Sequence, residues 1–237
     1  MPVAREGHSA GWWIARALLL MLAAFLLVQA WFAATIVWYR FEPPRETAFM
    51  AERLSDLRKT NPHARLDYRF VPYPRISQNL KRAIIAAEDA KFLEHDGFDW
   101  DGIELALQKN SRRGHIVAGG STITQQLAKN LFLSPSKSYL RKGEEAIVAV
   151  MLETILDKRR ILELYLNVIE WGSGVFGAEA AARHYYGIPA AQLSAAQAAR
   201  LAAMAPSPQR FERNPHSAYL TGRTATIMAR MEGTAAP

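Results

Sequence analysis

The sequence lacks cysteine, so no disulfide bond can contribute to its stability. It also lacks clear alternation of apolar and polar residues, the pattern of a half-buried β-strand, outside one short stretch near residues 66–71. Helical periodicity dominates instead, and helices are expected near residues 47–59, 78–95, 100–111, 122–132, 137–157, 158–169, 175–186 and 194–205. The sequence therefore predicts a mostly α fold.

Charged residues are absent from residues 17–39, which read ALLLMLAAFLLVQAWFAATIVWY. At ~1.5 Å per residue, a helix of this length crosses a hydrocarbon core of ~30 Å. A cleaved signal peptide is the competing interpretation, but its apolar core is ~7–15 residues long and ends at small residues, whereas this segment ends in VWY. We therefore expect one transmembrane helix. Arg5 and Arg16 precede it and favour a cytoplasmic N-terminus, which places the rest of the chain outside the cytoplasm.

The net charge is +7, and residues 1–40 hold three arginines and one glutamate, so residues 41–237 carry +5. This balance fits an anionic membrane surface or a phosphate-bearing substrate, and a membrane anchor makes nucleic acid the least fitting partner. The predicted organisation is a cytoplasmic tail (1–16), a transmembrane helix (17–39), a juxtamembrane connector (40–76) and a C-terminal helical domain (77–237).

A carboxylate interrupts an apolar ridge in the helix expected at 78–95. Leu80, Ile84, Glu88 and Phe92 recur every four residues, so they are predicted to share one face. A carboxylate on a partly apolar wall has its pKa raised, towards values that suit a general base. The alternative interpretation is a structural salt bridge or a helix that places Glu88 at its rim.

Acidic residues are missing from residues 105–143, although seven lysines and arginines lie there. Within this stretch, GGSTITQQLAKN places two glycines before a helix start, where Ser121 or Thr122 can cap the helix and Thr122 with Gln125 matches a capping box. A glycine-rich entry into a capped helix exposes backbone N–H groups to anions, and Lys129 and Lys137 could add charge. An ordinary capped helix with surface lysines is the alternative.

The segment RKGEEAIVAVMLE places Arg141 and Glu145 four residues apart, so they can pair on one helical face. Val148 and Leu152 continue that face, which puts a second carboxylate beside an apolar stripe. A surface ion pair is the simpler interpretation.

Four ordered segments together resemble the peptidoglycan glycosyltransferases, family 51 of the glycosyltransferases. They are AAEDAKFLEHDGFD, GGSTITQQLAKNLFL, RKGEEAIVAVMLE and KRRILELYLNVIEWGSGVFGAEAAARHYYG, and the resemblance covers most of residues 72–212. Little chain follows, so the resemblance is to the monofunctional biosynthetic kind and not to bifunctional penicillin-binding proteins. It implies a lysozyme-like, mostly α domain with a membrane-hugging lobe, located in the periplasm and anchored in the bacterial inner membrane.

The resemblance also implies residue roles. Glu88 matches the family's general base, and Glu145 matches its second carboxylate. The positions implied to bind substrate or pyrophosphate are Lys129, Lys137, Arg141, Ser121, Thr122, Gln125, Gln126, Arg113 and Asn130. A divalent metal, Mg²⁺ or Mn²⁺, is expected near Glu88 or Glu145. The chain departs from the family at His115, where a basic residue, often arginine, is usual, and nearby Arg113 could substitute for it.

The implied activity is polymerisation of lipid II into β-1,4-linked glycan with release of polyprenyl pyrophosphate. Expected partners are lipid II, the growing glycan, the membrane and other cell-wall synthesis proteins. One alternative is a muramidase or lytic transglycosylase, whose chemistry needs a protonated acid and no phosphate-binding cations. Another is a non-enzymatic, membrane-anchored scaffold of cell-wall synthesis.

Overall fold

The computed structural model describes residues 9–115, 119–133 and 138–237. The described chain is mostly helical, as predicted. Its elements are α1 (Ala10–Tyr39), α2 (Ala48–Thr60), β1 (Asp67–Tyr68), η1 (Tyr73–Arg75), α3 (Gln78–Glu88), α4 (Trp100–Arg113), α5 (Ile123–Phe132), α6 (Tyr139–Ile155), α7 (Lys158–Val168), β2 (Glu170–Gly172), β3 (Val175–Phe176), α8 (Ala178–Tyr186), η2 (Ala190–Gln192), α9 (Ala195–Met204), α10 (Pro208–Arg213) and α11 (Ala218–Met231).

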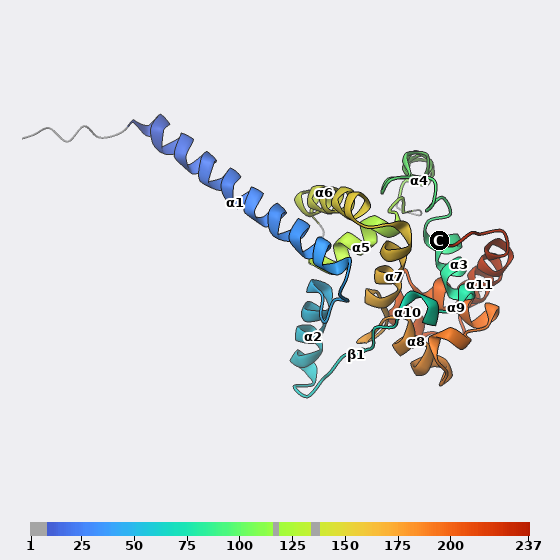
Figure 1. The fold of residues 1–237 in the computed structure, drawn as a ribbon. Helices are drawn as coiled ribbons and strands as arrows, with labels where there is room; N and C mark the ends of the chain where they lie inside the picture. Colours follow the sequence, from blue (N-terminus) through green and yellow to red (C-terminus); the bar gives the residue numbers. More distant parts are fainter. Residues whose placement is uncertain (1–8, 116–118, 134–137) are drawn as a thin grey trace, which may run out of the picture.

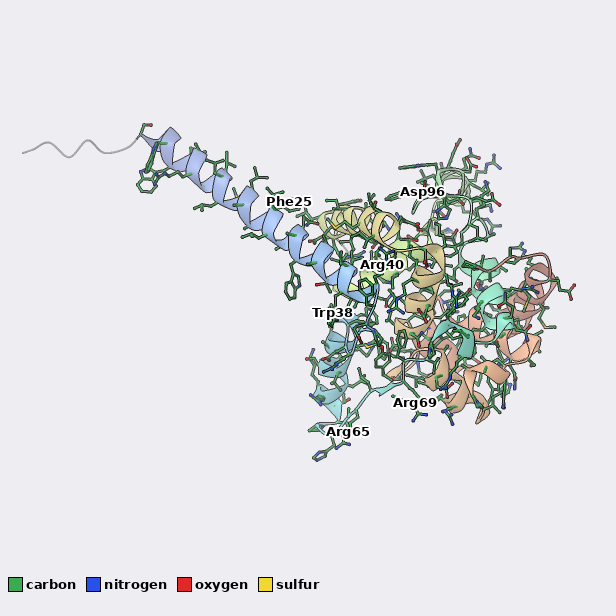
Figure 2. All side chains as sticks on the ribbon, in the orientation of Figure 1. Phe25, Trp38, Arg40, Arg65, Arg69 and Asp96 are labelled. Atoms are coloured by element: carbon green, nitrogen blue, oxygen red, sulfur yellow. The ribbon has the colours of Figure 1, made fainter. Side chains whose placement is uncertain are left out.

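Helix α1 projects from the rest of the molecule (Figure 1). Its 30 residues extend about 45 Å, and among the described helices it alone is long and apolar enough to cross a membrane. Large apolar side chains cover its surface; Phe25 and Trp38 are examples (Figure 2). A helix of a soluble core would bury such side chains, so α1 fits the predicted membrane anchor. Only its C-terminal part packs on the domain, where Phe32 contacts Phe132 with ring centroids 4.9 Å apart.

Most helices begin where a short polar side chain accepts a backbone N–H of the first turn. The side chains of Thr47, Ser77, Asp99, Thr122, Ser138, Asp157, Ser194 and Ser217 do so. The capping box predicted at Thr122 and Gln125 is confirmed, because each of these residues accepts the other's backbone N–H. These caps explain why helix starts could be located from sequence.

Helix α3 ends at Glu88, so the expected helix of 78–95 is too long. The prediction that Phe92 shares a helical ridge with Glu88 is therefore wrong, although Phe92 is fully buried in the turn that follows. The cause lies in Asp89, which leaves helical geometry (φ −161°, ψ 73°) and directs its carboxylate to the backbone N–H of Ile123 in α5. This long-range hydrogen bond replaces continuation of the helix.

One continuous core joins two groups of helices. Helices α3, α9 and α11 pack against one another, and α5 packs between α6 and α7. A three-stranded sheet, ordered β1–β3–β2, adds a parallel pair and an antiparallel pair to the side near α8. The connector helix α2 packs on α5, and helices α10 and α11 were not predicted.

Candidate active site

Glu88 is the last residue of α3 and is mostly buried, with 11% of its side chain exposed. Its Oε2 accepts a hydrogen bond of 3.0 Å from Nε2 of Gln126 on α5. The orientation of that amide is fixed, because its Oε1 accepts a 2.9 Å bond from the hydroxyl of Tyr165 on α7. Burial raises the pKa of Tyr165 well above its usual range, so this hydroxyl keeps its proton and remains the donor. Three helices therefore position the carboxylate.

The other oxygen of Glu88 faces Arg223 on α11. The guanidinium Nη2 lies 3.6 Å from Oε1 and donates a 3.3 Å hydrogen bond to the carbonyl of Ala87. The sequence analysis missed Arg223, although a signal was present. Arg223 lies three residues after Leu220 and four before Ile227, both buried, so it shares the inward face of α11.

Burial raises the pKa of Glu88, as the apolar ridge predicted. The hydrogen bond from Gln126 and the charges of Arg223 and Lys129 oppose this rise, and the charge of Asp89 adds to it. The pKa remains raised because loss of hydration is the largest effect. A carboxylate of this kind is a stronger base than an exposed glutamate, as proton abstraction requires.

Asp89 has a different environment from its neighbour. It is buried, and both its oxygens are engaged: Oδ2 accepts the N–H of Ile123 at 3.0 Å, and Oδ1 lies 2.9 Å from Nε2 of His95. The hydroxyl of Thr122 also donates to the carbonyl of Gly97 at 2.7 Å. These contacts join the end of α3 to the start of α5, so Asp89 has a structural role.

Glu145 forms the second charged centre. Its side chain is buried, Arg141 Nη1 donates to Oε2 at 2.8 Å, and Lys142 pairs with Oε1. The pairing of Arg141 with Glu145 is confirmed, but the simple surface interpretation is wrong because the carboxylate is almost inaccessible. Lys142 was not predicted to belong to the site, and its Nζ also lies 3.2 Å from the hydroxyl of Ser121.

Charged groups of both centres affect the pKa of Lys129. Burial lowers its pKa, the charges of Glu145 and Glu88 raise it, and those of Arg141 and Lys142 lower it. All four charges act on this one ammonium, so the two centres belong to one site. Lys129 also lines the cavity described below, where its Nζ lies 5.9 Å from the centre of the Phe49 ring.

Other predicted residues have varied positions. Thr122 and Gln125 are buried, and their polar atoms serve the capping box. Asn130 Nδ2 donates to the carbonyl of Gln126 at 2.7 Å. Arg113 is exposed at the end of α4, where its carbonyl contacts His115 at 2.8 Å, and no contact among the described residues joins it to Glu88 or Glu145. Lys137 lies outside the described residues.

A cavity of about 360 Å³ adjoins the site. Gln126, Lys129 and Tyr165 line it on one side, and residues of α2 and α10 complete its wall, including Arg53 and Arg210. Its lining residues are Phe49, Arg53, Gln126, Lys129, Asn130, Tyr165, Ile169, Glu170, Ala205, Pro206, Ser207, Pro208, Gln209, Arg210 and Arg213. Glu170, the single acid in this lining, is paired with Arg53 at 2.9 Å, so the cavity attracts anions.

The described residues do not form a dedicated metal site. No three His, Asp or Glu side chains within residues 9–115, 119–133 and 138–237 are grouped as ligands. Both oxygens of Glu145 already contact cations, and those of Glu88 face Gln126 and Arg223. Any divalent metal held by either carboxylate would therefore share it with these partners.

Comparison with known proteins agrees with this geometry. The transglycosylase family model matches residues 55–232. The chain is 57% identical over 225 residues to the biosynthetic peptidoglycan transglycosylase of Laribacter hongkongensis, covering 95% of this chain and 99% of that protein. The chain is 56% identical over 227 residues to the protein of that name from Dechloromonas aromatica, and this match covers 96% of this chain and 98% of that protein. Its identity to the protein of that name from Bordetella pertussis is 54% over 222 residues, and this match covers 92% of each chain. The extent of these matches shows that the chain belongs to the transglycosylase family.

Proposed function

We propose that this peptidoglycan glycosyltransferase polymerises lipid II, with Glu88 as the general base. The observation that carries the proposal is a mostly buried carboxylate of raised pKa beside a cavity lined by cations. The names of its relatives support glycan polymerisation. Lipid II supplies a sugar hydroxyl to deprotonate and a pyrophosphate to neutralise, which matches both parts of the site.

In the proposed reaction, the growing glycan is the donor and its reducing-end C1 carries the pyrophosphate. Glu88 accepts the proton of the 4-hydroxyl of the incoming lipid II as that oxygen bonds to C1. The bond from C1 to the phosphate oxygen breaks, and its electron pair leaves with the polyprenyl pyrophosphate. Attack opposite the leaving group converts an α-linked phosphate into a β-1,4 glycosidic bond.

The leaving group needs positive charge more than a proton. Lys129 and Arg141 are the cations that we assign to this task, since one faces the cavity and the other lies in the second centre. Glu145 then acts by holding Arg141 and Lys142 in place. We assign no direct substrate role to Thr122 or Gln125, whose side chains form the helix cap.

We propose a more specific way in which the expected Mg²⁺ or Mn²⁺ would be held. Mg²⁺ in proteins is often held by one or two carboxylates plus substrate phosphates. Because neither Glu88 nor Glu145 is free of partners, such an ion would depend mainly on pyrophosphate oxygens. The chemistry it supplies is neutralisation of the leaving group.

A glycan-cleaving enzyme of the usual kind would use two available carboxyl groups across the scissile bond. In the described part of the site, Asp89 and Glu145 both have their oxygens engaged, so Glu88 has no such partner. The cationic lining also has no purpose in that reaction. A non-enzymatic scaffold would not need Glu88 to ionise.

We further propose that α1 anchors the enzyme in the inner membrane with residues 40–237 in the periplasm. Exposed apolar side chains on α6, including Tyr139 and Leu140, and on α4, including Trp100, suit contact with the same membrane. A reporter active only outside the cytoplasm, fused after Pro237, is expected to be active. Activity of a cytoplasm-only reporter at that position would reverse this topology.

The decisive experiment incubates the full-length, detergent-solubilised protein with lipid II and separates polymer from hydrolysis product. We expect glycan polymer and polyprenyl pyrophosphate. Release of free disaccharide-peptide without polymer would support a hydrolase, and no turnover under any condition would support a scaffold.

A further inference from the structure

A second cavity lies where α1 joins the domain, apart from the active site. Its volume is about 380 Å³, and its lining residues are Arg40, Phe41, Leu156, Asp157, Arg159, Arg160 and Glu163. None of these residues lines the cavity beside Glu88. Figure 2 shows Arg40 at the junction between α1 and the domain.

Arg160 connects the wall of this cavity to the C-terminal end of α1. Its Nε donates a 2.7 Å hydrogen bond to the carbonyl of Tyr39, and its Nη2 donates a 3.2 Å bond to the carbonyl of Glu42. Carbonyl groups at a helix C-terminus lack donors within the helix, so the guanidinium supplies a hydrogen bond that the end of α1 would otherwise lack. The start of α7 is thereby held against the last turn of α1, which is the end of the predicted membrane span.

The acids in this lining are already engaged. Glu163 pairs with Arg160 and accepts the backbone N–H of Tyr73. Asp157 caps α7 by accepting the backbone N–H of Arg160 at 2.7 Å. Asp157 is exposed and keeps its charge, so the three arginines and two acids of the lining sum to +1. Arg40 and Arg159 are also exposed, and neither forms an ion pair with an acid in the described part of the chain.

The positive field extends beyond the cavity wall. Arg159 lies 5.0 Å from the centre of the Tyr73 ring, and Lys81 Nζ lies 3.9 Å from the same centre. Burial lowers the pKa of Lys81, the charge of Arg159 lowers it further, and Glu163 opposes both. Several cations thus converge on a region where few acids compete for them.

Apolar groups also line the cavity. Phe41 lines it and is 73% exposed, and Leu156 contributes a second apolar wall. Trp38, the last residue but one of α1, is also exposed and suits the headgroup level. A ligand here would combine an anionic group with an apolar portion.

We propose that this cavity binds the phosphate headgroup of an anionic phospholipid from the membrane that α1 crosses. Arg40 and Arg159 bind the phosphate, since guanidinium groups match phosphate oxygens in charge and geometry. Phe41 contacts the glycerol and the first acyl carbons. A zwitterionic lipid binds less well, because its ammonium group enters the same positive field.

The test measures lipid binding to the full-length protein in a neutral detergent by native mass spectrometry. Phosphatidylglycerol is the probe, phosphatidylcholine is the zwitterionic comparison, and inorganic phosphate is the free-anion comparison. The expected affinity order is phosphatidylglycerol, then phosphatidylcholine, with inorganic phosphate unable to displace the lipid at equal concentration. Equal binding of the two lipids, or displacement by inorganic phosphate, would overturn the proposal.

A matched pair of double variants tests the location of the site. Arg40→Gln with Arg159→Gln is expected to weaken phosphatidylglycerol binding about 25-fold, since each basic residue near a lipid surface contributes about fivefold. Arg65→Gln with Arg69→Gln removes the same charge from exposed positions far from Arg40 (Figure 2) and should change binding less than twofold. Equal losses in both pairs would show that only net charge matters.

A single conservative variant separates geometry from folding. Arg159→Lys keeps the charge and removes the planar guanidinium, so we expect an intermediate loss of phosphatidylglycerol binding with an unchanged thermal transition. An affinity equal to that of the unmodified protein would remove Arg159 from the site.

Discussion

Replacing Glu88 by glutamine is the most direct test of the proposed mechanism. The change removes the proton acceptor and preserves size, and the new amide oxygen can still accept the hydrogen bond from Gln126. A positioned general base contributes ~10²–10⁴-fold to turnover. At ~1.36 kcal/mol per factor of ten, this corresponds to a loss of ~2.7–5.4 kcal/mol of transition-state stabilisation.

The structure also bounds the effect of this substitution on stability. The variant loses the ion pair with Arg223, whose side chain is 30% exposed and whose nitrogen is 3.6 Å away. Solvent-screened pairs of this kind contribute ~0.2–1 kcal/mol. Removing a mostly buried carboxylate of raised pKa acts in the opposite direction. We therefore expect the melting temperature to shift by no more than ~4 °C.

The assay follows polymer formation from lipid II, with lipid II binding and thermal unfolding measured on the same preparation. Glu94→Gln is the matched control, because Glu94 is exposed and close in sequence, and its rate should stay within about twofold. A near-normal rate for Glu88→Gln would refute the reasoning, and the salt-bridge interpretation of Glu88 would then stand. A large loss of stability would instead assign the residue a structural role.

Four further outcomes are expected. Glu88 must be ionised to act as a base, so activity should fall as the pH drops through its raised pKa. Arg223→Leu removes a charge that lowers this pKa, so the loss of activity at low pH should begin at a higher pH in the variant's pH–rate profile. Lys129→Ala and Arg141→Ala should each reduce kcat/KM for lipid II at least tenfold, since a charged hydrogen bond is worth ~1.5–3 kcal/mol; wild-type kinetics would exclude a role in phosphate binding. Asp89→Asn should lower the free energy of unfolding by ~1–3 kcal/mol in a denaturant titration, because the buried contacts to Ile123 and His95 are weakened. Removing divalent metal with a chelator should slow polymerisation and leave the thermal transition unchanged, and an unchanged rate would exclude a metal requirement.

Local features of the sequence predicted local structure well. The polar cap at Thr122, the spacing of Arg141 and Glu145, and the uncharged run of the predicted membrane helix are all local features of the sequence. Such features are readable before the fold is known. The apolar residues around Glu88 also predicted the direction in which its pKa shifts.

The features that were missed depend on contacts distant in sequence. Arg223 contacts the carbonyl of Ala87 from 136 residues away, and no local pattern shows that α3 and α11 are neighbours. Helix α11 itself was missed because threonines and Gly222 lower its helix propensity, although the capping Ser217 was visible. The extra length predicted for α3 arose in the same way, since the partner of Asp89 lies in α5.

The end of α3 at Glu88 explains how two adjacent carboxylates acquire different roles. Had the helix continued, Asp89 would lie ~100° around its axis and would not be directed to α5 by an extended backbone. Because the helix ends, Asp89 binds the first N–H of α5, the helix that also carries Gln126 and Lys129. The residue next to the proposed base therefore fixes the helix that supplies two of the groups acting on its pKa. It follows that Asp89→Asn should impair catalysis as well as stability, and that the surviving folded fraction should show a shifted pH profile.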